Sequence, residues 1–423
     1  MSVLGLQALK TATREGARAR GAFGKGKYKG KHNVSKCKNG KSDGTYSCSK
    51  IDMHGFLSHE EMGSVTREGN DIWGWSYGKR EFGVVGQTDG TAFVEVLSNG
   101  DVKYLGRLPT QTVPSIWRDV KVIDGYAYIG SEAKDHGLQI FDLRKLLKLR
   151  EPKEFSLEDQ TAVFTGFGSS HNIVANEKTK MIYAVGTKFC SGGLYMVDVS
   201  NPAKPVDKGC AAMDGYSHDA QCVVYRGPDR EYRGREICFS YNEDSLTIYD
   251  VTDKSNPVVV SKVGYEGYAY THQGWLVNDD MTHLLLDDEL DEVRNTAPGG
   301  NDKTTTYIFD VSDLKKPFFT GLWKSQAKSI DHNQYVVDGL SYQANYASGL
   351  RIVDVSSIPK DPSGKKVKEV GFFDVYPEDD EEPVNEFFGS WSVYPYFKSG
   401  YILLNSIERG VFSLKYTGRK PRN

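Results

Sequence analysis

The stretch that decides the fold is Met196-Val197-Asp198-Val199-Ser200-Asn201-Pro202, a strand-like run that ends in Asp, a small hydroxyl residue and a proline. Asp and Ser side chains can bond nearby backbone N–H groups, so they favour a turn. Proline cannot occupy a central strand and marks the connection to an outer one. The pattern recurs as IFDL (140–143), IYDVT (248–252) with Pro257, IFDVS (308–312) with Pro317 and IVDVS (352–356) with Pro359.

The recurring unit predicts about four short strands over roughly 40 to 50 residues, which is the period of a β-propeller blade. We predict an all-β, seven-bladed β-propeller with blades near residues 70–109, 116–155, 170–211, 217–264, 271–324, 331–374 and 388–417. The last blade has only three strands, and an open ring would leave unpaired strand edges. Residues 49–57 are therefore predicted to supply its outer strand. The alternative architecture is an open sandwich or two smaller β domains.

Residues 1–41 differ from the rest because Lys and Arg recur throughout, with Glu15 as the only acid. Such a segment buries too little apolar surface to offset its ordering entropy. We predict a basic flexible arm at 1–41, and a single propeller domain at 42–423 that keeps its fold without the arm. The arm is either an electrostatic tether to an acidic surface or a solvated linker or pro-segment.

Composition limits the partners of the chain. The 423 residues carry a formal net charge of -3, which gives no indication of nucleic acid or of an anionic membrane as partner. No apolar run approaches the roughly 20 residues of a membrane span. The first ten residues are too weakly apolar for the core of a signal peptide, so an export signal is not visible. We expect a monomer.

Six cysteines, an even number, favour three disulfides and an oxidising, extracellular compartment. Cys222 and Cys238 fall on neighbouring predicted strands of one blade, where cross-strand Cβ atoms are close enough to be bridged. Cys37 and Cys48 would close a short loop, which leaves Cys190 with Cys210. The alternative is six buried free thiols in a cytosolic protein.

A polar pair occupies the same place in every blade, at the start of the innermost strand. The pairs are Asn70-Asp71, Arg118-Asp119, His171-Asn172, His218-Asp219, His272-Gln273, His332-Asn333 and Trp391-Ser392. Innermost strands line the central channel, and side chains alternate between the two faces of a strand. The four histidines therefore either face one ring-shaped site or all turn away together. We predict that at least three of His171, His218, His272 and His332 point into the channel at one level.

Imidazole is a common ligand of transition metals, so the four histidines are candidate ligands of a divalent transition metal. The alternative is structural, with each ring bonded to the backbone of the next blade. Asp71, Arg118, Asp119 and Trp391 flank the group and are candidate ligand-binding residues. Arg118 could bind a substrate carboxylate.

Two acidic runs are less specific. The run Asp287-Asp288-Glu289-Leu290-Asp291-Glu292 follows a strand, and it either binds a hard cation such as calcium through carboxylate oxygens or is a solvated loop. The run from Glu378 to Glu382 is predicted to be a solvated loop.

Taken together, these stretches resemble the LVIVD-repeat propellers, in particular the choice-of-anchor B group of bacterial and eukaryotic surface proteins. The matching stretches are NDIWGW (70–75), WRDVKV (117–122), DHGLQ (135–139), HNIV (171–174), SHDAQC (217–222), NED (242–244), THQGWL (271–276), DHN (331–333) and YQANY (342–346). The resemblance covers about residues 45–417. It implies a seven-bladed propeller, export and a surface or extracellular location, and it implies no particular reaction.

Three functions are compatible with this sequence. The first is an extracellular module that binds a glycan or a surface protein at its channel mouth, with or without a metal on the histidines. The second is a metal-dependent enzyme of lyase or oxygenase type with an axial four-histidine site. The third is a scaffold whose channel is filled by side chains.

Overall fold

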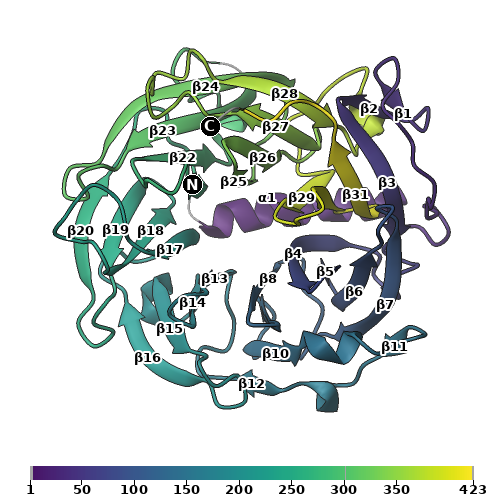
Figure 1. Ribbon diagram of the computed structural model, residues 1–423, viewed down its shortest axis with the longest axis horizontal. Coiled ribbons are helices and arrows are strands. Elements are labelled where there is room, and N and C mark those ends of the chain that lie inside the picture. The colour runs from purple at the N-terminus through teal and green to yellow at the C-terminus, as the bar shows by residue number, and fades with distance from the viewer. Residues whose placement is uncertain (1–2, 301, 422–423) are drawn as a thin grey trace.

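The computed structural model describes residues 3–300 and 302–421, and it is a ring of seven β-sheets around a central channel (Figure 1). The sheets follow one another around the ring in chain order. The predicted seven-bladed β-propeller is confirmed.

Each blade runs from an inner strand at the channel to an outer strand at the rim. The strands are β4 (Gly69–Tyr77), β5 (Arg80–Gln87), β6 (Gly90–Val96) and β7 (Val102–Pro109) in blade 1; β8 (Arg118–Ile123), β9 (Tyr126–Ser131), β10 (Leu138–Asp142) and β12 (Ala162–Phe164) in blade 2; β13 (Asn172–Asn176), β14 (Met181–Val185), β15 (Leu194–Asp198) and β16 (Val206–Ala211) in blade 3; β17 (Asp219–Val224), β18 (Glu236–Asn242), β19 (Ser245–Asp250) and β20 (Val258–Val263) in blade 4; β21 (Thr271–Leu276), β22 (His283–Asp288), β23 (Lys303–Asp310) and β24 (Phe318–Lys328) in blade 5; β25 (Asn333–Val337), β26 (Leu340–Ala344), β27 (Leu350–Asp354) and β28 (Lys368–Phe373) in blade 6; and β29 (Ser390–Tyr394), β30 (Tyr401–Ser406), β31 (Gly410–Tyr416) and β3 (Ile51–Ser58) in blade 7.

Short elements complete the fold. Strand β11 (Lys153–Glu154) pairs with blade 1, and β1 (Lys41–Ser42) and β2 (Tyr46–Ser49) extend blade 6. The helices are α1 (Val3–Ala19), α2 (Asp291–Arg294), η1 (Leu143–Leu146), η2 (Leu157–Asp159), η3 (Cys190–Gly192) and η4 (Pro377–Asp379).

The recurring Asp makes the turn that the sequence pattern predicts. In five blades its Oδ1 accepts a hydrogen bond from the backbone N–H two residues later, at 2.8–3.1 Å. The donors are Arg144, Ser200, Thr252, Ser312 and Ser356. This local bond ends the third strand of the blade and directs the chain toward the rim.

The ring closes between the two ends of the propeller. Strand β3 pairs antiparallel with β31, from Ile51 opposite Tyr416 to Ser58 opposite Gly410. Residues 49–57 were predicted to do this, and the observed strand lies within one or two residues of those bounds. The pairing removes two free sheet edges.

The predicted boundary of blade 2 needs correction. Its outer strand is β12, beyond the predicted end at residue 155, whereas β11 pairs in parallel with β7 of blade 1. The reason is apolar burial, because Leu143 and Leu146 of η1 and then Phe155 pack into the core of blade 1 against Phe93. The chain therefore crosses to the neighbouring blade before it returns.

The flexible arm predicted for residues 1–41 is a second correction. Helix α1 crosses the middle of the ring (Figure 1) and buries Leu6, Lys10, Arg14 and Ala17 on one face. Farther on, backbone bridges join Lys31 to Phe56 and Ser35 to Met53. Composition gave the wrong prediction because two of the four buried positions on the helix are basic. The buried partners of these basic side chains lie far away in the sequence.

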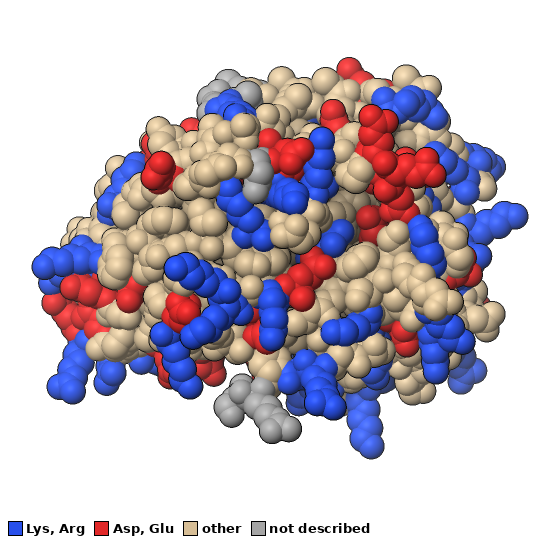
Figure 2. Space-filling view, turned by 90° about the horizontal axis from the view of Figure 1, so that it is seen from above, with Lys and Arg blue, Asp and Glu red and all other residues tan. Residues whose placement is uncertain are grey.

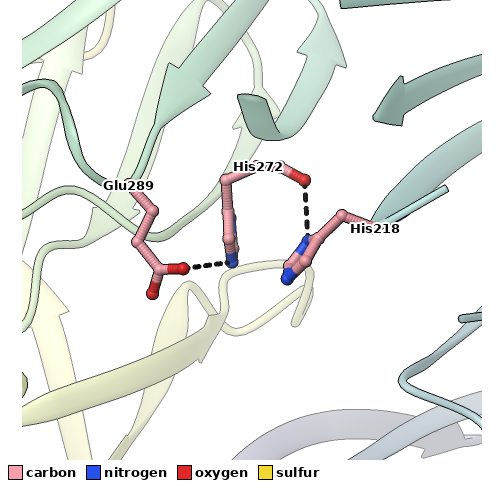
Figure 3. Close-up of side chains that lie close together, drawn as sticks. All are labelled: His218, His272 and Glu289. Carbon is pink, nitrogen blue, oxygen red and sulfur yellow. Dashed lines mark hydrogen bonds and ion pairs between the residues drawn. The ribbon is translucent and has the colours of Figure 1, made fainter. Parts of the chain in front are cut away.

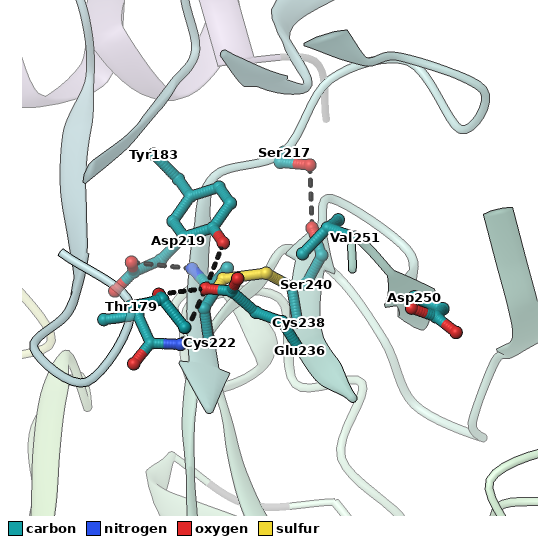
Figure 4. Close-up of a disulfide and its surroundings, with 12 residues drawn as sticks. Thr179, Tyr183, Ser217, Asp219, Cys222, Glu236, Cys238, Ser240, Asp250 and Val251 are labelled. Carbon is teal, nitrogen blue, oxygen red and sulfur yellow. Dashed lines mark hydrogen bonds between the residues drawn. A yellow bond between two sulfur atoms is a disulfide. The ribbon is translucent and has the colours of Figure 1, made fainter. Parts of the chain in front are cut away.

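All three predicted disulfides are present: Cys37–Cys48, Cys190–Cys210 and Cys222–Cys238. Figure 4 shows the last of these bridging the first two strands of blade 4, beside Glu236, which accepts hydrogen bonds from Tyr183 and Thr179. Three disulfides indicate an oxidising environment.

Removing the Cys222–Cys238 bridge with a Cys222→Ser/Cys238→Ser variant should lower the free energy of unfolding by about 3 kcal/mol, since the bridge closes a loop of 16 residues. Denaturant melts of oxidised wild type and variant test this. Reductant should destabilise the wild type more than the variant. Equal stability of the two oxidised proteins would show that the bridge adds nothing to the paired strands.

The surface carries charges of both signs. On the side of the molecule in Figure 2, basic and acidic side chains are interspersed. No helix among the described residues has both the length and the apolar character needed to cross a membrane.

Candidate functional site

The four predicted histidines meet at one end of the channel, beneath α1. His171, His218, His272 and His332 come from the amino ends of β13, β17, β21 and β25. Successive ring centroids are 4.3, 4.1 and 4.5 Å apart. All four are buried, because the helix covers this end of the channel. The common register of the inner strands brings the rings together.

Hydrogen bonds determine which nitrogen of each ring carries the proton. Nδ1 of His218 donates to the backbone carbonyl of His272 at 3.0 Å, and Nδ1 of His332 donates to that of Trp391 at 2.6 Å. Nδ1 of His171 donates to the Glu132 carboxylate at 2.5 Å. In the neutral form, all three rings therefore keep an unprotonated Nε2. Metal-binding histidines commonly have this arrangement.

Two of these Nε2 atoms lie against each other. Nε2 of His171 and Nε2 of His218 are 2.7 Å apart, although each ring already uses its Nδ1 as a donor. Two lone pairs at this distance repel, so in this contact one of the two nitrogens carries a proton.

A carboxylate completes the cluster. Glu289, in the turn after β22, points toward His272, with 3.6 Å between Glu289 Oε2 and His272 Nε2 (Figure 3). Its Oε1 is 3.6 Å from Nε2 of His332. Ligand atoms of His218, His272 and Glu289 all lie within 4.8 Å of one another. Sequence reasoning placed Glu289 only in a candidate calcium run.

The N-terminal helix places a cation in this cluster. Lys10 Nζ is 2.5 Å from Glu289 Oε1 and 5.3 Å from the centre of the Trp391 ring. Burial raises the pKa of Glu289, while the Lys10 charge opposes that rise. Burial lowers the pKa values of His218, His272 and His332, so these rings are held neutral. Burial also lowers the pKa of Lys10, and the Glu289 carboxylate opposes that fall, so each charge of this pair supports the other.

Of the four predicted ligand-binding residues, Trp391 joins this cluster, with its ring 4.9 Å from His332. Arg118 does not, because its guanidinium is enclosed by Thr91, Thr110, His136 and Gln139. Burial lowers its pKa to about 9. Arg118 occupies the same place in its blade as the histidines do in theirs, and this similarity misled the prediction. Its side chain packs within its own blade and against blade 1.

Asp71 and Asp119 form a separate centre with Lys121. Lys121 Nζ is 2.8 Å from Asp119 and 3.4 Å from Asp71. The two carboxylates also accept backbone hydrogen bonds from Val120 and Ile173, which links blades 1, 2 and 3. Lys121 Nζ lies 4.8 Å from the centre of the Trp73 ring. Both residues line the hollow at the other mouth of the channel.

That other mouth is a funnel-shaped hollow of about 860 Å³. Its aromatic lining comes from the carboxyl halves of inner strands and the turns after them. The aromatic residues are Trp73, Trp75, Tyr77, Trp275, Tyr335, Tyr394 and Tyr396. Lys121, Asp219 and Gln221 add polar groups. We call this hollow the aromatic funnel.

Sequence analysis missed the aromatic funnel, although a signal was present. Trp73, Trp275, Tyr335 and Tyr394 each follow the aligned polar pair of their blade by two or three residues. In the structure Tyr335 lies 5.4 Å from Trp73 and 5.0 Å from Trp275, ring centre to ring centre. Alternation along the inner strand points these rings into the channel below the polar pair.

The acidic run from Asp287 to Glu292 is not a solvated loop. Its acidic side chains are all buried, and burial raises the pKa values of Asp287, Asp288 and Glu292. Both carboxylate oxygens of Asp288 already accept hydrogen bonds, from the Tyr265 hydroxyl and from the backbone N–H groups of Ala269 and Tyr270. In the second run, Glu381 and Glu382 are exposed as predicted, but Asp379 and Asp380 are half-buried. Glu378 pairs with Arg409 and Asp380 with Lys41, so this part of the run is not simply solvated.

The fold defines the class of this protein as a seven-bladed β-propeller. Two of its segments, residues 117–143 and 189–211, match the LVIVD repeat. The comparison with curated proteins found no match. Among solved structures, the chain is similar to the β-propeller domain of Cps50 (Swd1) from Myceliophteria thermophila, with 10% identity over 82% of this chain and 100% of that chain and a TM-score of 0.47.

Proposed function

We propose that this protein is an extracellular or cell-surface binding module that holds a glycan in the aromatic funnel. The observation that carries the proposal is the aromatic lining of a hollow of about 860 Å³, in which Trp73, Trp275 and Tyr396 keep part of their surface exposed. Ligand pockets of this size are lined by aromatic residues with a few polar groups that orient the ligand.

A glycan fits this chemistry better than a folded protein does. The C–H faces of a sugar ring pack on aromatic faces, and its hydroxyl groups can bond Lys121, Asp219 and Gln221. A protein partner requires a broad interface of about 800 Å² on each side. The concave shape of the aromatic funnel favours a ligand that enters it.

The proposed location rests on the three disulfides and on the resemblance to surface proteins described above. The glycans of cell surfaces and extracellular matrices lie in such an oxidising compartment.

Glycan-array screening of the purified protein, followed by calorimetry, tests this function. Trp73→Ala and Trp275→Ala should each raise the dissociation constant of the selected glycan at least tenfold, because each removes a partly exposed stacking face. Tyr268→Ala, at a tyrosine that is 52% exposed and outside the aromatic funnel, is the matched control and should bind as wild type does. Equal binding by all four proteins, or no glycan bound, would reject the proposal.

A second candidate is a metal-dependent enzyme centred on the histidine cluster. The observation that favours it is the set of three inward Nε2 atoms, each fixed in place by an Nδ1–H bond on the other side of the ring. His171, His218, His272, His332 and Glu289 are the residues that would hold a divalent transition metal. Such a metal supplies Lewis-acid or oxygen-activating chemistry. Lys10 would have to leave Glu289 before the metal could bind.

A further inference from the structure

Three buried carboxyl groups converge between blades 5 and 6, outside both sites described above. Asp291 and Glu292 lie in the connection from β22 to β23, and Asp331 directly precedes His332 at the start of β25. They are 0%, 3% and 1% exposed. One carboxylate oxygen from each lies within 4.8 Å of the others.

Most oxygens of this cluster lack a partner. Asp291 Oδ2 accepts from the Tyr307 hydroxyl at 2.6 Å, and Asp331 Oδ2 accepts from Thr305 N at 3.2 Å. The other Asp oxygens and both oxygens of Glu292 have no hydrogen-bond partner. Within residues 3–300 and 302–421, no Lys, Arg or His forms an ion pair with any of the three.

Unpaired buried carboxyl oxygens are costly, and a protein relieves that cost by protonation or by a bound cation. All three side chains are fully buried, so bulk water cannot supply the missing partners. The neighbouring Glu289 shows the second solution, because it is paired with Lys10. No such ammonium group reaches Asp291, Glu292 or Asp331 among the described residues.

The spacing of the cluster fits a large hard cation. Calcium binds oxygen ligands at 2.3–2.6 Å, so two ligands of one ion lie at most about 5 Å apart. The three oxygens meet that condition. All are carboxylate oxygens, which calcium prefers and soft metals do not.

We propose that Asp291, Glu292 and Asp331 bind one calcium ion, with water completing the coordination. Only two of these ligands belong to the acidic run that the sequence suggested, and the third comes from the next blade. The ion would join blade 5 to blade 6. It would also fix the turn that carries Glu289 and the residue before His332. The proposal is independent of the aromatic funnel and of a metal on the histidines.

The test uses the full chain after treatment with a calcium chelator. Calorimetry should find one calcium equivalent, and calcium should raise the melting temperature. Terbium should bind competitively and show emission sensitised by Tyr307, whose hydroxyl donates to Asp291. Glu292→Gln and Asp331→Asn should each weaken calcium binding at least 100-fold. A Glu381→Gln/Glu382→Gln variant at the exposed end of the second acidic run is the matched control and should bind as wild type does.

Stability without calcium gives a second readout. Both amide variants should then melt at or above the temperature of calcium-free wild type, because each removes a buried unpaired carboxyl. A His218→Ala/His272→Ala variant should keep its calcium. If wild type binds no calcium, or if the Glu292→Gln and Asp331→Asn variants bind it as tightly as wild type, the cluster is only protonated and the proposal is overturned.

Discussion

Replacing Lys10 with Met should lower the free energy of unfolding by about 3–5 kcal/mol, the cost of removing one partner of a buried ion pair. Lys10 and Glu289 are 3% and 0% exposed, and their charged atoms are 2.5 Å apart. The Met side chain keeps the apolar stem among Tyr346, Phe387 and Trp391 but leaves Glu289 without its cation. Chemical denaturation at neutral pH measures the loss.

Two further variants define the cause of that loss. Lys36→Met removes an exposed lysine and should change stability by less than about 0.5 kcal/mol. Lys10→Met/Glu289→Gln should recover most of the stability, because the double change leaves no unpaired buried charge. If Lys10→Met is as stable as wild type, α1 does not dock in solution, and residues 3–19 are flexible as composition suggested.

Lys10→Met should also raise the affinity of the histidine cluster for zinc or cobalt at least 100-fold. The ammonium group and a divalent cation compete for Glu289 and repel each other at short range. Full-length wild type should therefore purify with little metal. Elemental analysis and the visible absorption of bound cobalt measure occupancy and ligand type.

The matched loss-of-ligand variant adds His218→Ala/His272→Ala to the Lys10→Met background. It should return metal content to near zero, because it removes two of the inward rings. Near-zero metal in wild type, in Lys10→Met and in the triple variant would rule out the metal centre. That outcome would leave the glycan-binding proposal intact, since the aromatic funnel lies at the opposite mouth of the channel.

Local sequence was enough to predict the blades, because five of the seven blades repeat a turn that their own Asp side chain makes. It was also enough for the convergence of the four histidines, since equivalent positions of inner strands lie at one level of the channel. The Cys222–Cys238 bridge followed from strand pairing within one hairpin. These features depend on contacts between residues that are close in sequence or repeated in register.

The remaining features depend on contacts across the ring. Sequence showed α1 as a basic segment, and only the fold supplies Glu289, 279 residues from Lys10 in the chain, to pair with its buried lysine. Arg118 matched the polar pattern, yet packing with Thr91 and His136 keeps it from the histidines. Asp331 joins Asp291 and Glu292 only because blades 5 and 6 are neighbours. Burial and charge pairing between distant segments are properties of tertiary structure. The local sequence around a buried charge does not show which distant residue will neutralise it.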